Sequence, residues 1–191
     1  MQSASSSRES LISRARHAVL ASGSQSDDVP MWIQGSWQRC LAQGFSPNQR
    51  LGFDVISQAH MRRSREANHC LVLAASSTLH SLATTIAPTR YFAILTNAQG
   101  VVVASSGAMD TRDRRAALIT REGVDLSERA VGTTAIGGAL IEQRDVWLHR
   151  GEHFLQTQAV IHALAHRSLV RKANAWACSM SPALMCPSAP S

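Results

Sequence analysis

The sequence has few of the residue types and patterns that mark membrane, secreted or redox proteins. Only one of its 191 residues is lysine, one is tyrosine, and aromatic residues make up 5% of the chain. No apolar stretch approaches the roughly 20 residues that a membrane-spanning helix needs, and the serine-rich start is followed by an amphipathic segment, not a secretory one. We therefore expect a cytoplasmic protein without a membrane partner.

The cysteines are widely spaced and form no Cys-x-x-Cys pair. They are Cys40, Cys70, Cys178 and Cys186. In a reducing cytosol, isolated cysteines are most simply buried or unreactive thiols, and neither disulfide partners nor zinc ligands. We therefore predict no disulfide, no bound metal and no cofactor.

Acidic residues are absent after Glu152, which makes the charge of the chain uneven. The net charge is +6, of which residues 1–90 carry +4, residues 91–162 carry −1 and residues 163–191 carry +3. Half of the positive excess therefore lies in the last 29 residues. A net positive charge can indicate a nucleic-acid partner, but here the excess is divided unevenly along the chain.

A smaller basic group opens a predicted helix and consists of Arg62, Arg63 and Arg65. A helix that reads DNA in this way needs a helix-turn-helix partner, and the sequence contains no recognisable one. We interpret the group as a solvated helix face and expect no direct DNA binding by this chain.

Three segments have the periodicity of amphipathic helices. Apolar residues recur at helical spacing in residues 8–20, 33–41 and 62–86. The second segment places Ile33, Trp37 and Leu41 on one face. The third contains neither proline nor glycine before Pro88 closes it, so we expect the longest helix there. Its apolar stripe consists of Leu71, Ala75, Leu79, Leu82 and Ile86.

Two β-rich runs follow, at residues 91–96 and 101–106. The four residues NAQG between them favour a hairpin turn. A short helix capped by Thr133 and a further strand at residues 145–149 complete the pattern. With 45% hydrophobic and 17% charged residues, these elements predict one α+β domain built on an antiparallel sheet flanked by helices.

Three further segments contain motifs whose joint occurrence is specific. They are IQGSWQRCLAQGFSP, AILTNAQGVVVASSG, and GVDLSERAVGTTAIGGAL running on to WLHRGEHFL. The first contains a Ser-Trp-x-Arg-Cys signature, formed by Ser36, Trp37, Arg39 and Cys40. Over residues 33–155 the three segments resemble the N-terminal GAF-type sensory domain of acetoin-regulator-like, sigma-54-dependent transcription activators. The last segment is similar to the Gly-Thr-Asn-Ala-Ile-Gly-Thr and Glu-His-Phe motifs of that family.

The resemblance implies a small-molecule-sensing regulatory domain and not an enzyme. In such activators the sensor controls a following AAA+ ATPase that acts on sigma-54 polymerase, with a helix-turn-helix at the end. The 191 residues contain neither a Walker A lysine nor a terminal DNA-binding unit. The expected partners are a small-molecule effector and a second copy of the chain in a homodimer. For the effector, acetoin, another small alcohol and an aromatic compound all stay open.

The resemblance also implies a ligand pocket at the start of a helix, where backbone amides and hydroxyl groups hold the oxygen atoms of a small polar ligand. The expected ligand-binding residues are Gly132, Thr133, Thr134, Ile136, His149, His153 and Phe154. The sequence departs from the family motifs at Thr134, Gly138 and Asp145, where Asn, Thr and Pro are usual. We expect these exchanges to change the hydrogen bonds that the pocket offers, and we interpret the Ser36 to Cys40 signature as structural.

Three alternatives stay open. His149, Glu152 and His153 match the His-x-x-Glu-His pattern of a metal-dependent hydrolase, although Gly151 interrupts the helix that this pattern needs. Cys40 would serve a thiol enzyme, although it is more simply a small buried residue. The apolar stripe of the long helix would serve a stand-alone GAF dimerisation module.

The resemblance ends after residue 162, which divides the chain into three expected parts. Residues 1–30 form an N-terminal helix and linker, residues 31–162 an incomplete GAF-type sensor, and residues 163–191 a basic tail. We expect the tail to be out of frame and disordered, and the sensor to be truncated before its last two strands.

The genetic code supports a frameshift in the tail. Read from the third base of each codon, Trp176 followed by Ala177 gives Gly, and Met180 followed by a fourfold Ser181 codon gives Val. The shifted frame permits Gly-x-x-Leu-Gly-Met-Leu-Asp-Val-like sequences, which look like the missing strands and their turn. We therefore predict a one-base deletion near codon 163 and poor solubility of this polypeptide.

Overall fold

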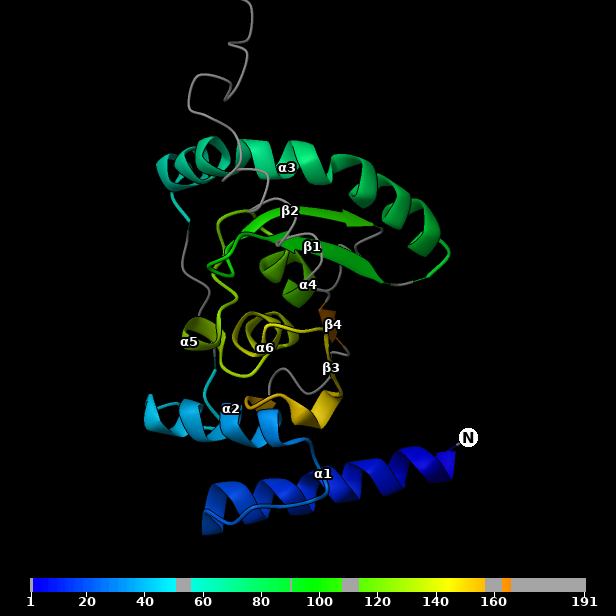
Figure 1. The fold of residues 1–191 in the computed structure, drawn as a ribbon, viewed down its shortest axis with the longest axis vertical. Helices are drawn as coiled ribbons and strands as arrows, with labels where there is room; N and C mark the ends of the chain where they lie inside the picture. Colours follow the sequence, from blue (N-terminus) through cyan, green and yellow to red (C-terminus); the bar gives the residue numbers. More distant parts are fainter. Residues whose placement is uncertain (1, 51–55, 90, 108–113, 157–162, 166–191) are drawn as a thin grey trace, which may run out of the picture. The chain divides into compact units, whose positions relative to one another are not determined.

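The computed structural model describes residues 2–50, 56–89, 91–107, 114–156 and 163–165 (Figure 1). The chain divides into two units. Unit 1 combines Met1–Gly52 with Leu126–His166, and unit 2 combines Phe53–Asp125 with Arg167–Ser191. Helices and antiparallel strands occur in both, so the predicted α+β class is confirmed. The described strands form two separate two-stranded sheets.

Unit 2 is built on a β-hairpin that a long helix covers. Its elements are α3 (Gln58–Ile86), β1 (Phe92–Thr96), β2 (Val102–Gly107) and α4 (Arg114–Ile119). Figure 1 shows α3 lying along the hairpin. The Ser57 side chain caps α3 by accepting a hydrogen bond from the His60 amide at 3.2 Å.

The hairpin turn forms at the predicted four residues. The Asn97 amide donates to the Val101 carbonyl at 2.9 Å, while the Asn97 side-chain oxygen accepts from the Gln99 and Val101 amides at 3.0 Å. Gly100 has a φ of 86°, which glycine adopts without strain. Turn chemistry that is local in sequence therefore fixes the antiparallel pairing of β1 with β2.

The predicted apolar stripe of α3 is only partly correct. Ala75 and Leu79 are buried against Leu95 and Val103, but Leu82 is 40% exposed. Of the other stripe residues, Leu71 and Ile86 are half-buried, and Ile86 lies near Gly107 at the end of β2, so Leu82 is the exception to the predicted stripe.

Unit 1 contains the remaining elements. They are α1 (Gln2–Ser22), α2 (Met31–Ala42), α5 (Glu128–Val131), α6 (Ala135–Glu142), β3 (Val146–Leu148), the 3-10 turn η1 (Arg150–Glu152) and β4 (Ala163–Ala165). Its core consists of Ile12, Ala15, Val19, Val29, Trp32, Ile33, Trp37, Cys40, Ala135, Ala139, Val146, Leu148, Phe154 and Leu155. Side chains from both ends of the sequence thus share one core.

The predicted N-terminal helix packs into the core of unit 1. Helix α1 is longer than the predicted segment 8–20, and its Ile12, Ala15 and Val19 are buried in the core that holds Trp37. The N-terminal helix is therefore part of the packed core of unit 1. Its three buried residues follow the i, i+3, i+7 spacing of one helix face, which favours docking over a free helix.

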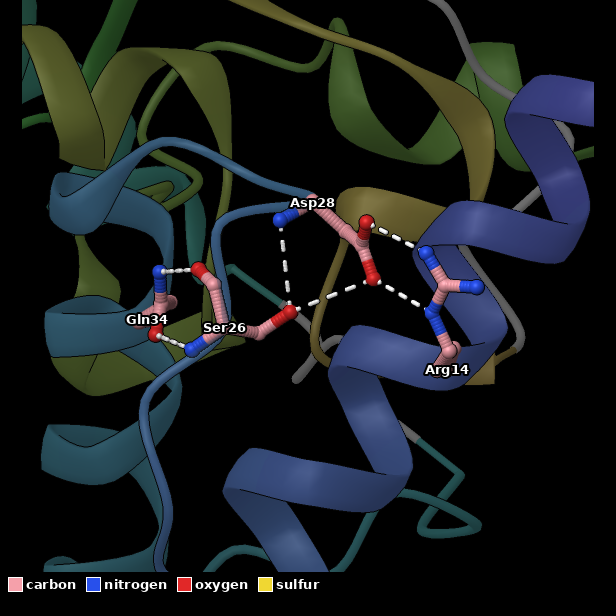
Figure 2. A network of polar contacts seen from close by, with 4 residues as sticks. All are labelled: Arg14, Ser26, Asp28 and Gln34. Atoms are coloured by element: carbon pink, nitrogen blue, oxygen red, sulfur yellow. Dashed lines mark hydrogen bonds and ion pairs between the residues drawn. The ribbon is translucent and has the colours of Figure 1, made fainter.

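A polar network fixes the segment between α1 and α2 (Figure 2). The Gln34 side chain donates to the Ser26 carbonyl at 2.6 Å and accepts from the Ser26 amide at 3.0 Å. Arg14 makes two hydrogen bonds of 2.7 Å to the Asp28 carboxylate, which also contacts the Ser26 hydroxyl. These side-chain hydrogen bonds hold a segment that has no regular secondary structure and that the sequence predicted only as a linker.

Three smaller predictions need correction. Leu41 is 39% exposed, and Cys40 takes its place on the buried face of α2 because the i, i+3, i+4, i+7 positions face one side. The cap of α6 is Thr134 and not Thr133: the Thr134 hydroxyl accepts from the Gly137 amide at 3.0 Å. Residues 163–165, expected in a disordered tail, form β4 and pair with β3.

No helix in the described ranges is both long enough and apolar enough to span a membrane. The rest of the predicted tail, residues 166–191, lies outside the described residues.

Candidate functional site

One face of α2 is joined to α5 by a buried polar cluster. The Ser36 hydroxyl donates to a carboxylate oxygen of Glu128 at 2.5 Å and lies 2.7 Å from the Thr133 hydroxyl oxygen. Arg39, three residues further along the same helix face, donates from Nε and a terminal nitrogen to the two Glu128 oxygens at 2.7 and 3.0 Å. We call Ser36, Arg39, Glu128 and Thr133 the α2–α5 cluster.

Glu128 is the charged centre of the α2–α5 cluster. It is only 4% exposed, whereas the Arg39 side chain is 39% exposed. The hydrogen bonds to Glu128 raise the pKa of the Arg39 guanidinium above its ordinary value, so the guanidinium keeps its charge at neutral pH. A buried carboxylate needs such bidentate pairing because desolvation would otherwise penalise its charge.

Trp37, the aromatic residue of the Ser-Trp-x-Arg-Cys signature, joins α2 to the segment that follows β3. Its side chain is fully buried, and its ring N–H donates to the Glu152 carbonyl at 2.8 Å. The guanidinium of Arg16 lies over its ring, with the central carbon 5.2 Å from the ring centroid. Trp37 therefore packs α1, α2 and η1 together.

The turn before α6 brings two predicted ligand-binding segments together. Gly132 adopts a φ of 74°, which turns the chain sharply after α5. Thr133 is fully buried, and its hydroxyl lies 3.6 Å from the Cys40 sulfur. The Thr133 carbonyl lies 3.0 Å from Nδ1 of His153, within hydrogen-bonding distance. We call this junction the Thr133–His153 site.

The other predicted ligand-binding residues have different surroundings. Thr134 caps α6 and also donates to the Leu126 carbonyl at 3.3 Å. Phe154 is fully buried and packs edge to face with Phe45 at a centroid distance of 6.5 Å. Ile136 and His149 are half-buried. Of the seven predicted residues, the structure therefore brings Thr133 and His153 into direct polar contact, with Gly132 shaping their turn.

The carboxylate of Glu152 has structural partners. It accepts a hydrogen bond from the His149 amide at 2.7 Å and forms an ion pair with Arg8 of α1. The side chains of the His-x-x-Glu-His motif lie on a 3-10 turn and not on one α-helix face. In the part of the chain that the structure describes, no three His, Cys, Asp or Glu residues are grouped to hold a metal ion. This geometry does not support the metal-hydrolase alternative.

The surroundings of Cys40 do not support a nucleophilic thiol. It is fully buried, and this burial raises the pKa of the Cys40 thiol above its ordinary value, so it is protonated at neutral pH. In a chain whose other three cysteines are changed to serine, we expect Cys40 to react with a thiol reagent on the order of 100-fold more slowly when folded than in denaturant. Equal rates in the two conditions would contradict this burial.

The sequence alone did not identify the roles of Glu128 and Arg16, nor the contact between Gly138 and Trp32. Glu128 lies inside the quoted motif GVDLSERAVGTTAIGGAL, and its place in that motif is the signal that could have identified it. A Cβ added at Gly138 would lie 2.6 Å from Cζ3 of Trp32. Gly138, where the family motif usually has threonine, therefore lies at the point where the Trp32 ring packs against α6.

This contact makes a specific prediction for Gly138→Thr. The added side chain must displace Trp32, and overpacking of this kind typically costs about 1–3 kcal/mol of unfolding free energy. The double variant with Trp32→Leu should recover much of the loss, since the smaller side chain leaves room. Urea unfolding of the two single variants and the double variant measures this, and strictly additive losses would show that the contact does not limit residue 138.

Two hollows lie away from the Thr133–His153 site. One in unit 1 has a volume of about 440 Å³ and is lined by Arg8, residues 25–31 and Gln34. One in unit 2 has a volume of about 210 Å³ and is lined by Ile56, Met61, Arg65, Ser105, Thr120, Arg121 and Glu122. Both are lined by many polar side chains, whereas small-molecule pockets are mostly apolar, so neither has the lining typical of such a pocket.

Comparison with known proteins identifies relatives over most of the chain. Residues 9–174 match the family model described as MimR, N-terminal domain. The match continues beyond residue 162, where the predicted resemblance ends. Because the match covers well over half of the 191 residues, it is sufficient to assign the family.

Two curated regulators are similar to the chain. The acetoin catabolism regulatory protein of Cupriavidus necator is 34% identical over 140 residues, covering 72% of this chain and 20% of that protein. The acetoin dehydrogenase operon transcriptional activator AcoR of Bacillus subtilis is 29% identical over 122 residues, covering 64% of this chain and 20% of that protein. The chain thus spans about a fifth of the length of the curated relatives it matches.

A solved structure shares the fold. A chain of the E. coli DhaR(N)–DhaL complex superposes with a TM-score of 0.60 at 18% sequence identity, covering 68% of this chain and 44% of that chain. At this identity the likeness concerns the fold alone.

Proposed function

The chain belongs to the family of MimR N-terminal domains, and on that premise we propose that it is a GAF-type domain that senses a small molecule for a transcription activator. The curated relatives are regulators of acetoin catabolism, and the chain is an acetoin-regulator-like N-terminal sensory domain. The finer parts of the proposal are the effector, its site and the control of a sigma-54-dependent ATPase elsewhere in the regulator.

The observation that carries the proposal is the contact between Thr133 and His153. These residues lie 20 positions apart in separate motifs, yet the Thr133 carbonyl and His153 Nδ1 are 3.0 Å apart in a buried setting. The Thr133 hydroxyl also lies beside the Ser36 hydroxyl and the Cys40 thiol. Three segments that are distant in the sequence therefore present a carbonyl, two hydroxyls and an imidazole at one place.

Such a set suits a small molecule with hydroxyl or carbonyl oxygens. A hydroxyl group can donate to the Thr133 carbonyl, and the His153 ring can donate to or accept from an oxygen according to its tautomer. In the structure these groups bond to one another. Effector binding would therefore exchange internal hydrogen bonds for bonds to the ligand, which couples occupancy to a change in protein structure.

Acetoin, another small alcohol and an aromatic compound are the proposed effectors, and the relatives' names favour acetoin as the first to test. A homodimer is proposed as the working assembly. The solved structure that shares the fold is a complex of DhaR(N) with DhaL, and we propose a protein partner as a second source of signal to be tested for this domain.

A reporter assay tests the proposal. The matching segment of the Cupriavidus necator regulator is replaced by this chain, and transcription is measured with acetoin, 2,3-butanediol and phenol. We expect one of these compounds to change transcription. His153→Asn, which keeps a donor near the Nδ1 position, should retain more of the response than His153→Leu. An unresponsive hybrid, or equal responses in both variants, would contradict the proposed site.

A further inference from the structure

Helix α1 contacts the segment after β3 through two arginines. Arg8 forms an ion pair with Glu152, and Arg16 donates to the carbonyl oxygens of Gly151, His153 and Phe154 at 3.2, 2.6 and 2.8 Å. The side chain of Ile12, between the two arginines, is 3.2 Å from the position that a Cβ at Gly151 would take. One face of α1 is thus fitted to this segment.

Arg16 is unusual because its half-buried guanidinium has no carboxylate partner among the described residues. Within the described ranges its hydrogen bonds go only to main-chain carbonyl oxygens. Burial lowers the pKa of the Arg16 guanidinium below its ordinary value, although not enough to remove its charge at neutral pH. The three carbonyls and the Trp37 ring are therefore what balances this half-buried cation.

His153 is held from two sides. Arg16 binds its carbonyl at 2.6 Å, while its ring nitrogen lies 3.0 Å from the Thr133 carbonyl. Arg16 binds the carbonyl of the peptide plane that follows His153, and the Trp37 ring N–H binds the Glu152 carbonyl of the plane that precedes it. This clamp sets the direction in which the His153 side chain leaves the backbone. Moving the clamp would therefore move the imidazole away from Thr133.

We propose that Arg16 is a positioning residue that holds the Thr133–His153 site closed. Without its hydrogen bonds the segment 151–154 loosens and His153 leaves Thr133, while the apolar face of α1 keeps the helix docked. Calling this site an effector site rests on the proposed function. The positioning itself is a property of the ligand-free chain and can be tested alone.

The test is hydrogen exchange of the full chain with matched variants. Arg16→Met removes the donors but keeps the stem over Trp37. Arg14→Met makes the same chemical change two residues away, where the partner is Asp28 in the linker network of Figure 2. Arg16→Lys keeps the charge but loses the planar arrangement of donors.

We expect Arg16→Met to speed amide exchange in residues 149–156 by about tenfold, with Arg16→Lys in between. Arg14→Met should leave this segment unchanged, and peptides from α3 and the hairpin should not respond to either variant. The imidazole resonances of His153 should shift in the Arg16 variants and not in Arg14→Met. Unchanged exchange at 149–156, or a uniform increase over the whole chain, would overturn the proposal by showing no positioning role or only a global loss of stability.

Acetoin binding separates this proposal from the proposed function. If acetoin opens the Thr133–His153 contact, a chain already loosened by Arg16→Met should bind acetoin a few times more tightly than the unmodified chain. Equal affinity would overturn the claim that Arg16 holds the site closed. If neither chain binds acetoin or the other test compounds, the effector assignment fails, and the exchange data still decide the positioning role.

Discussion

Replacing Arg39 with methionine is expected to lower the free energy of unfolding by about 3–5 kcal/mol, the usual cost of leaving a buried charge without its partner. Glu128 is 4% exposed and would keep only the Ser36 hydroxyl as a hydrogen-bond donor among the contacts described above. Because methionine preserves most of the side-chain volume, the loss should reflect the carboxylate and not a cavity. Urea unfolding measures the difference.

An exposed ion pair provides the control for this prediction. Arg65 and Glu122 also form a salt bridge, but their side chains are 63% and 31% exposed. Arg65→Met should therefore cost much less unfolding free energy than Arg39→Met, because solvent screens surface pairs. Equal losses in the Arg39 and Arg65 variants would show that burial of Glu128 contributes nothing to the stability of unit 1.

Restoring the proposed reading frame near codon 163 is expected to raise the free energy of unfolding by roughly 6–12 kcal/mol. We propose this because two regular strands would bring at least four apolar side chains, each worth about 1.5–3 kcal/mol when fully buried. In the described residues, β3 pairs with β4 over only three positions. Such a gain is comparable to the whole stability of an ordinary domain.

The comparison needs the gene and two polypeptides. Sequencing establishes whether the shifted frame is intact beyond codon 163, and thermal unfolding compares this chain with the restored one. We expect a broad transition for the present chain and a sharp, cooperative one for the restored chain. A gene with no Gly-Met-Leu-Asp-like alternative frame beyond codon 163 would contradict the deletion. A sharp transition in the present chain, or no gain on restoration, would contradict its expected poor stability.

Local signals in the sequence were sufficient for several elements. The NAQG turn specified the hairpin because Asn97 and Gly100 act through bonds within a few residues. Unbroken apolar periodicity specified α3 for a similar reason. The motifs also placed Thr133 and His153 in one region, and the structure brings the two into contact.

Features that depend on distant partners could not be found in this way. An isolated glutamate such as Glu128 is expected at the surface, and only the approach of Arg39 and Ser36 from α2 makes its burial favourable. The docking of α1 depends on carbonyl oxygens, which every residue has and which no motif records. Arg16 could therefore not be distinguished from the other arginines of the N-terminal half before its three acceptors were known.

The most direct test of the sensory account is an NMR titration of the full chain with acetoin, 2,3-butanediol and phenol. We predict a saturable change at Thr133 and at the His153 imidazole with one of these compounds, and its loss in His153→Leu. Changes that instead gather around Arg8 and Gln34, which line the larger hollow, would place the ligand elsewhere in unit 1. Absence of any saturable change would contradict small-molecule sensing by this domain.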